Sequence, residues 1–330
     1  MRIIKLGYYF EAFNNKCINT LFSDIEKMVN GTIFKADETV CHYFPKSALL
    51  SIIKDKKFYF SDTDFLNDYS EMKHIYSVIE KVVSQGDTDS AAIKLFKEIL
   101  RNKTMIVDDI SFIGKEIEDD SENDGFIFNR RNYVFCCSLD NDCLSNWKYY
   151  GKGNGYDAYN ITFNANHYLK YIKSILKFKE YKCLSGIVIY DDDIKAEMIS
   201  DLIQKIDAFI EVSNPDSNMM RALETRLFYY IMDISLFFKD SAYKDEKEYR
   251  FVLGLDNSKI RNNALEYDFR FANDILVPYL KIPFDKDMVE LVGIGPCMNS
   301  DLSSKSLFAL LQYYNFENTS VGKSSLPLRY

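Results

Sequence analysis

The sequence predicts an α+β fold in which mixed, largely antiparallel sheets carry helical insertions. Strand-like segments gather toward both ends of the chain with long amphipathic helices between them, and this order does not alternate as a doubly wound βαβ sheet would. With 13 Gly and 6 Pro among 330 residues, the chain holds little material for a flexible linker. We therefore expect a single compact domain over residues 1–330, with residues 1–40 as an N-terminal extension and about 191–240 as a helical insertion.

In the first half of the chain, periodicity and turn residues predict the elements. Residues 1–40 suggest a short strand at 3–10 and a helix that ends before Gly31. Alternating apolar residues predict a strand at 39–44, Pro45 opens a helix, and a second strand follows. We expect this second strand at 57–61, helices at 72–83 and 91–100, an irregular acidic segment at 103–129, a buried strand at 133–138 and a helical turn at 144–150.

The second half begins and ends with strands. We expect them at 156–163, near 178–183 and 186–190, then at 249–255, 266–271, 276–282, 288–294 and near 319–322. Helices are expected from 194 to 209, over the mostly apolar residues 219–239, and at 302–313.

Composition limits the classes of function. The 47% of hydrophobic and 27% of charged residues are typical of a globular chain and exclude a disordered one. A net charge of −8 disfavours the binding of nucleic acid and of anionic lipid. No apolar run reaches the roughly 20 residues that a membrane span needs. Seven dispersed cysteines without a CxxC pair indicate free thiols of a reducing cytoplasm. Three histidines without metal-ligand spacing argue against a metal site.

Glu246, Glu248 and Arg250 follow one another at every second position on the approach to the apolar segment 251–253. In an extended chain all three project from one face. Two carboxylates and a guanidinium form an array suited to ribose hydroxyls, to an oxocarbenium-like centre or to orienting a nucleophile. The alternative is a half-exposed strand whose arginine pairs with its charged neighbours.

Two further segments carry candidate binding residues. His42 and Tyr43 lie on the strand expected at 39–44, where His42 faces apolar neighbours and is either a satisfied core residue or a ligand-binding one. Trp147, the only tryptophan, precedes Tyr150 and a glycine-rich turn at 151–155. This segment is either an aromatic clamp for a planar ring or core packing.

Known catalytic motifs are missing from the sequence. The Gly-Lys-Gly-Asn-Gly run at 151–155 has neither P-loop nor dinucleotide-binding spacing, and no GxSxG elbow occurs. Acidic runs at 118–124 and 191–193 leave a carboxylate-metal nuclease as an alternative, although acidic runs in loops usually face solvent as caps.

Several short motifs follow one another from about residue 40 to the C-terminus. They are His42-Tyr43, Phe65-Leu66-Asn67-Asp68 with Glu71, Cys137-Ser138, Trp147 with Tyr150, Gly151 and Gly155, Lys239 and Lys244 before Glu246-x-Glu248-x-Arg250, Gly295-Pro296, and Ser324-x-x-Pro327-x-Arg329. In this order they resemble a bacterial family known as domain of unknown function 2971. Leu66 interrupts the family's Phe-Asn-Asp pattern, and Tyr243 stands where the family often has Trp.

That family is in turn similar to the ADP-ribosyltransferase superfamily, which implies an ADP-ribosyltransferase-like core and NAD as substrate. By this resemblance His42 contacts the NAD ribose, Tyr150 or Trp147 stacks on nicotinamide, and Tyr43 and Arg250 belong to the same binding site.

The resemblance also implies the catalytic roles. Glu248 would bond the ribose 2′-hydroxyl and stabilise the oxocarbenium-like transition state, and Glu246 would orient or deprotonate the acceptor. This chemistry needs no metal. The spatial relation of His42, Tyr150 and Glu248 tests this implication. If they line one cleft the function is favoured, and if they lie on opposite sides of the sheet it is contradicted.

The implied function is an NAD-consuming mono-ADP-ribosyltransferase, or an NAD glycohydrolase, that acts in the cytoplasm as effector of a bacterial anti-phage defence or toxin system, as in abortive infection. Its partners would be NAD, a protein or nucleic-acid acceptor and an antitoxin or other defence protein, with no membrane. The alternatives are a metal-dependent nuclease effector and a non-enzymatic sensor of a nucleotide or a phage protein.

Overall fold

The computed structural model describes residues 15–30, 33, 38–66, 71–110, 130–151, 157–176, 181–256, 265–272, 274–296 and 300–327. These residues divide into two compact units, where the sequence predicts one. The helical unit takes residues 1–33, 68–130 and 188–243, and the sheet unit takes residues 34–67, 131–187 and 244–330. The strand expected at 3–10 and the acidic residues 118–124 lie outside the described part of the chain.

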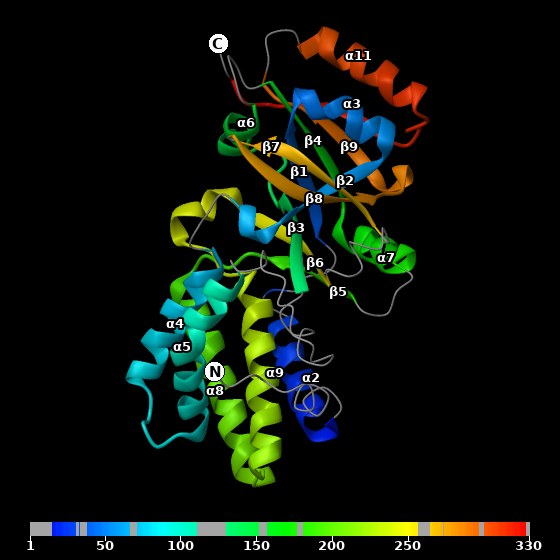
Figure 1. Cartoon of the computed structure of the whole chain (residues 1–330). Helices are drawn as coiled ribbons and strands as arrows, with labels where there is room; N and C mark the ends of the chain where they lie inside the picture. The colour runs from blue at the N-terminus through cyan, green and yellow to red at the C-terminus, as the bar shows by residue number, and fades with distance from the viewer. Residues whose placement is uncertain are drawn as a thin grey trace. The chain divides into compact units, whose positions relative to one another are not determined.

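The helical unit consists of long helices that pack side by side (Figure 1). They are α2 (Lys16–Asn30), α4 (Glu71–Gln85), α5 (Ala91–Ile110), α8 (Asp192–Ser213) and α9 (Ser217–Ser235). The expected insertion at 191–240 supplies only α8 and α9, and the other helices of this unit come from two earlier segments of the chain. Helix α5 reaches Ile110, so the prediction of irregular chain from residue 103 is wrong there.

One buried lysine ties the helical unit together. Lys195 of α8 is fully buried, and its Nζ lies 2.8 Å from Nε2 of His74 on α4. The same Nζ donates to Asp192 Oδ1 at 2.8 Å and to the carbonyl of Lys239 at 2.7 Å. A lysine at such depth is tolerated because acceptors surround its charge. None of the helices among the described residues is long and apolar enough to cross a membrane.

The sheet unit is built on a mixed, mostly antiparallel sheet, which confirms the predicted α+β class. Its strands are β1 (Thr39–Pro45), β2 (Lys57–Asp62), β3 (Arg130–Ser138), β4 (Ala158–Asn164), β5 (Tyr181–Ile187), β6 (Glu248–Asp256), β7 (Glu266–Ala272), β8 (Ile275–Pro283), β9 (Val289–Ile294) and β10 (Ser320–Lys323). The spatial order is β10-β9-β4-β1-β3-β2-β8-β7, with β6 joined to β3 and β5 joined to β6. Only β9 and β10 are known to pair in parallel among the described strands.

Strand β3 is the branch point of this sheet. Its last residue, Ser138, pairs with Cys41 of β1, and its earlier residues Tyr133 and Val134 pair with β2. Strand β6 pairs with β3 as well, so β3 has three partner strands. The two strands expected at 178–183 and 186–190 are one strand, β5.

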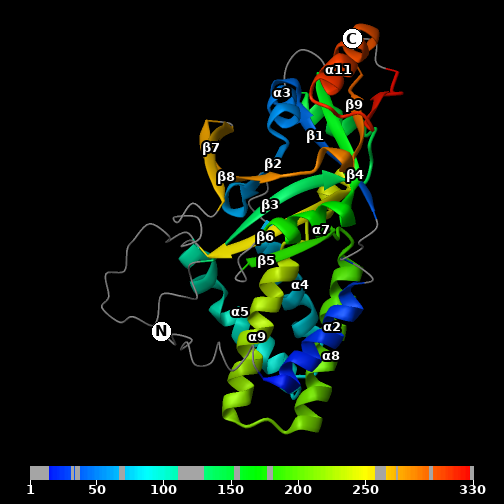
Figure 2. The ribbon, with the colours of Figure 1, turned by 90° about the vertical axis from the view of Figure 1, so that its right-hand side faces the viewer.

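One face of the sheet carries the main core of this unit. Three helices cover it, α3 (Lys46–Asp55), α7 (Ala165–Ile175) and α11 (Ser300–Tyr313), through buried residues such as Ile53, Tyr168 and Leu307 (Figures 1 and 2). Helix α3 begins after Pro45, as predicted, and ends at Lys56, whose left-handed φ of 52° stops the helix. Helix α7 was not predicted.

The opposite face is covered near β1 and β4 by the short helix α6 (Leu144–Tyr150). There a small second cluster buries Tyr43, Trp147 and Ala158, with Tyr150 packed at its edge. Three 3-10 turns complete the described structure: η1 (Thr63–Phe65), η2 (Ser241–Glu246) and η3 (Lys286–Met288).

Candidate active site

The segment that carries the Glu-x-Glu-x-Arg motif changes direction before β6. Glu246 is the last residue of η2, Lys247 has a left-handed φ of 44°, and the strand begins at Glu248. The prediction that Glu246, Glu248 and Arg250 project from one face of an extended chain is therefore wrong for Glu246. It holds for the other two, because residues two apart in a strand share a face.

Glu248 and Arg250 form a buried ion pair. Their residues are only 4% and 1% exposed, and two parallel contacts join them: Arg250 Nε to Glu248 Oε1 at 2.6 Å and Nη2 to Oε2 at 2.9 Å. The alternate residues Tyr249, Phe251 and Leu253 point into the main core, as predicted. A guanidinium in this bidentate geometry favours the ionised form of the carboxylate.

The segment that follows β3 holds this turn in place. Ser138 Oγ donates to the carbonyl of Glu246 at 2.8 Å, and the N–H of Leu139 donates to the carbonyl of Lys247 at 2.8 Å. Lys247 Nζ also contacts Asp140 Oδ2 at 2.8 Å. These bonds fix where Glu246 and Glu248 stand, a role that we did not predict for Ser138 or Asp140. The sequence feature that could have indicated this role is Ser138-x-Asp140 at the end of a strand, because Ser and Asp side chains in loops often bond to nearby backbone groups.

The aromatic residues of the candidate site stack in a row. The Trp147 ring, 1% exposed, meets Tyr43 edge-on at 4.7 Å between centroids, and Tyr43 lies parallel to Tyr150 at 6.1 Å. Trp147 Nε1 donates to Asp142 Oδ1 at 2.8 Å, and the Tyr43 hydroxyl donates to the carbonyl of Asp140 at 2.7 Å. Trp147 and Tyr43 are thus packed and hydrogen-bonded core residues, while the half-buried Tyr150 also meets the exposed Tyr149 edge-on at 5.0 Å.

Tyr150 and Glu248 lie on the same face of the sheet, because Glu248 alternates with the core residues Tyr249 and Phe251 and Tyr150 packs with Tyr43 on the face opposite that core. The pKa of the Tyr150 phenol is raised well above its ordinary value, first by burial and then by its acidic neighbours Cys136, Glu248, Tyr149 and Glu246. Both glutamates thus act electrostatically on this hydroxyl. The structure places Tyr150 and Glu248 on one face of the sheet, with Glu246 on the turn that precedes β6.

His42 lies on the opposite, core-facing side of the sheet, so the expected cleft of His42, Tyr150 and Glu248 is not formed, and this placement counts against the ADP-ribosyltransferase hypothesis. It alternates with Tyr43 along β1, and its ring packs against Phe135 at 4.4 Å between centroids and near Phe58 at 6.1 Å, both of them residues of the main core. Its Nδ1 lies 2.8 Å from the carbonyl of Cys136, just beyond the point where β1 and β3 pair. The neutral ring can donate this bond to the carbonyl of Cys136.

Protonation of His42 is expected to destabilise the sheet unit in acid. Burial lowers the pKa of His42 from 6.5 to about 4; the charge of Arg270 adds to this, and the bond to Cys136 opposes it. Between those values the unfolded chain binds a proton that the folded chain does not, so stability falls as the pH falls.

The free energy of unfolding is measured in urea by Trp147 fluorescence at about pH 7.5 and about pH 4.5. From the higher to the lower pH, this free energy should fall by about 2–3 kcal/mol more in wild type than in His42→Gln. Equal losses in the two proteins would contradict this account of His42.

Several other predicted features are structural or lie outside the described residues. Asp191 caps α8 by accepting from the N–H groups of Asp193 and Ile194, and Asp192 pairs with Lys195. The described residues contain no group of three His, Cys, Asp or Glu side chains that could hold a metal ion. The glycine-rich residues 152–156, the Asn67-Asp68 pair and Arg329 are not among them.

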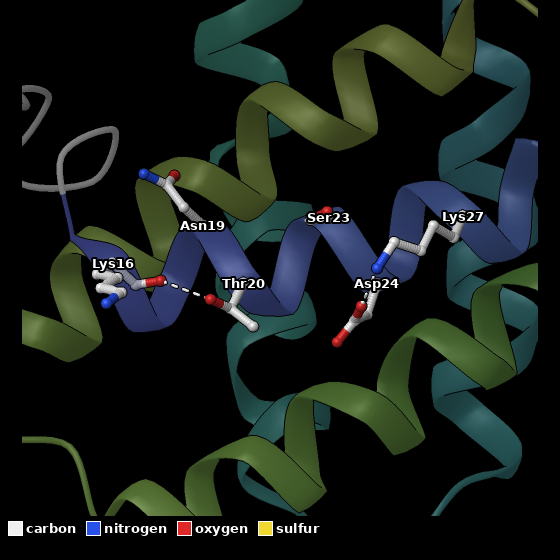
Figure 3. Close-up of a pocket in the computed structure, with 6 residues that line it drawn as sticks. All are labelled: Lys16, Asn19, Thr20, Ser23, Asp24 and Lys27. Atoms are coloured by element: carbon white, nitrogen blue, oxygen red, sulfur yellow. Dashed lines mark hydrogen bonds and ion pairs between the residues drawn. The ribbon is translucent and has the colours of Figure 1, made fainter.

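An open hollow lies along α2 (Figure 3). It is lined by Lys16, Asn19, Thr20, Ser23, Asp24 and Lys27. Thr20 Oγ1 donates to the Lys16 carbonyl at 2.9 Å and Lys27 Nζ contacts Asp24 Oδ1 at 2.9 Å, so polar groups of this helix bond to one another. The hollow is the groove of one amphipathic helix, and we assign it no ligand.

The family comparison matches the part of the chain that holds most of this site. A family model described as "Protein of unknown function (DUF2971)" matches residues 146–251, which include Trp147, Tyr150, Glu246, Glu248 and Arg250. No curated protein and no solved structure matches the chain. Over residues 146–251 the chain is therefore similar to the DUF2971 family, as the order of its motifs indicates.

Proposed function

We propose that the protein consumes NAD at the face formed by Tyr150, Glu248 and Glu246, as a mono-ADP-ribosyltransferase or an NAD glycohydrolase. The observation that carries the proposal is the position of Glu248: a buried carboxylate, paired with Arg250 and on the same face of the sheet as the half-buried Tyr150. In a site shielded from water, a fixed negative charge acts strongly on a cation that forms beside it.

The chemistry follows from these groups. When the N-glycosidic bond of NAD breaks, nicotinamide leaves with the bonding electron pair and the ribose becomes oxocarbenium-like. The Glu248 carboxylate stabilises that positive charge, and the flat Tyr150 ring offers a surface for nicotinamide. Glu246, on the neighbouring turn, accepts the proton of the acceptor hydroxyl or water as its oxygen bonds to the anomeric carbon.

The sheet supports an ADP-ribosyltransferase-like core as part of this proposal. The sheet branches at β3, where β1, β2 and β6 all pair, and β6 is a late strand that begins at a glutamate. In this proposal His42 holds the β3 carbonyl of Cys136 and does not contact ribose, because its ring lies among the core phenylalanines. Tyr43, Trp147 and Arg250 support the site from beneath it.

The cellular setting is proposed on the resemblance alone. NAD depletion, or modification of a macromolecular acceptor, would make the protein an effector of a bacterial defence or toxin system, held in check by a partner. In the acidic run 191–193, Asp191 caps α8 and Asp192 pairs with Lys195, and neither role favours the nuclease alternative.

A second candidate function is supported by one observation. Arg250 contacts both oxygens of Glu248, as in a purely structural ion pair. A site of this kind could bind a nucleotide through Tyr150 without reacting, which is the non-enzymatic sensor hypothesis.

The two candidates differ in what happens to bound NAD. Purified protein is incubated with NAD, with and without a lysate as source of acceptors, and nicotinamide and ADP-ribose are quantified by chromatography. We expect nicotinamide release, with free ADP-ribose for a glycohydrolase and protein-linked or nucleic-acid-linked ADP-ribose for a transferase. Calorimetric binding of NAD without release would favour the sensor, and NAD that neither binds nor reacts would overturn the proposal.

A further inference from the structure

Strand β7 is an edge of the sheet that carries exposed aromatic residues. Among the described strands it pairs only with β8, and the two form a hairpin at the end of the sheet order (Figure 2). Phe269 and Phe271 are 50% and 80% exposed, and Leu276, which pairs with Phe271 across the hairpin, is 48% exposed. Edge strands with apolar side chains are templates for pairing with another chain.

The outer edge of β7 presents its backbone bonding groups at Phe269. This residue lies opposite Pro278, which has no N–H to give, and the Phe269 N–H donates to Asp268 Oδ1 at 2.8 Å. In an antiparallel ladder, bonded and non-bonded residue pairs alternate, so Tyr267, Phe269 and Phe271 direct their N–H and C=O groups away from β8. This edge is therefore ready to accept a further strand.

The sequence of β7 is complementary to itself. In an antiparallel pair of two β7 strands centred on Phe269, that residue faces its own copy and exchanges two backbone bonds with it. Tyr267 then faces Phe271 of the second strand, and Asp268 faces Arg270, twice over because of the two-fold symmetry. A register two residues earlier would set Asp268 against Asp268, and a register two residues later would set Arg270 against Arg270.

We propose that β7 pairs with β7 of a second copy of this chain, in the register centred on Phe269, and joins two sheet units into one continuous sheet. The aromatic residues of both strands lie together on one face, extended by Leu276 of each hairpin. The charges meet on the other face at a non-bonded pair position, where side chains approach closely. Within one chain Asp268 Oδ2 contacts Lys281 Nζ at 2.7 Å and Arg270 Nη2 donates to Ser61 Oγ at 2.8 Å. In the dimer Asp268 Oδ1 exchanges the Phe269 N–H for the arginine of the second copy. This proposal is independent of the proposed function.

Charge exchange tests the register. Arg270→Asp carries two acidic residues at 268 and 270, and Asp268→Arg carries two basic ones, so each variant alone repels its own copy. Sedimentation velocity of the full chain, from about 1 µM to about 300 µM, should show wild type associating to a dimer and each variant at least tenfold weaker. An equimolar mixture of the two variants should regain a dimer, because every charge then faces its opposite.

A second variant keeps the test independent of folding defects. Phe271→Glu changes an exposed side chain and should also weaken association at least tenfold, with the Trp147 emission of wild type as evidence of an intact sheet unit. A wild-type chain that stays monomeric, charge variants that dimerise alone, or a mixture that stays monomeric would each overturn the proposal.

Discussion

Arg250→Met is expected to lower the free energy of unfolding of the sheet unit by about 3–5 kcal/mol, because it leaves the Glu248 carboxylate buried without its guanidinium. Both residues are almost fully removed from solvent and joined by two contacts. Loss of one member of such a pair costs more than the pair itself contributes, since desolvation of the remaining charge is no longer offset.

The double variant Glu248→Leu/Arg250→Met should recover much of that loss, because it buries no charge. A matched control is Lys247→Met, which removes an exposed partner of Asp140 and should cost at most about 1 kcal/mol. Trp147 is the only tryptophan and lies in the sheet unit, so its fluorescence during urea unfolding reports this unit by itself. A loss below about 1 kcal/mol for Arg250→Met would contradict a buried pair, as would a double variant no more stable than the single one.

Strand β6 shows how much of the site could be predicted from local pattern. Alternation alone places Tyr249 and Phe251 in the core and Glu248 with Arg250 on the other face, because a strand repeats every two residues. The same rule fails one step earlier, at Glu246. The strand pattern is broken at Lys247, which has a positive φ. A lysine is not a residue type that indicates a positive φ, so this break could not be predicted from the sequence.

Helix α7 was missed although its signals are present. Asn164 caps it by accepting from the His167 N–H at 3.1 Å, and the buried Tyr168 and Ile172 are four residues apart. These are start and periodicity signals of an amphipathic helix. The division into two units could not be predicted in the same way, because the helical unit is assembled from three separate segments of the chain.

Whether Trp147 and His42 are core residues or ligand-binding residues depends on contacts with residues far away in the sequence. Trp147 is a core residue because Tyr43, about a hundred positions earlier, packs against its ring. His42 lies on the core side because Phe135 contacts it across the β1–β3 junction. Local spacing is the same whether such a side chain packs or binds a ligand, so only the tertiary fold separates the two.

Glu248→Gln is expected to lower nicotinamide release by about 10²–10³-fold, because a neutral amide cannot stabilise the positive charge that develops on the ribose. Glutamine has the shape of glutamate and retains an oxygen that can accept from Arg250, so NAD binding should change much less than turnover. Glu246→Gln serves as a contrast. It should reduce transfer to an acceptor more than it reduces nicotinamide release, since Glu246 acts on the acceptor.

The most direct test of the account is the rate of nicotinamide release from NAD by wild type, by Glu248→Gln and by Glu290→Gln, an exposed glutamate of β9 that serves as matched control. Each protein is first shown to keep the wild-type Trp147 emission. The account predicts release by wild type and by Glu290→Gln at equal rates, and release by Glu248→Gln that is about 10²–10³-fold slower. Release by Glu248→Gln at the wild-type rate would contradict the account, and so would NAD left intact by all three proteins.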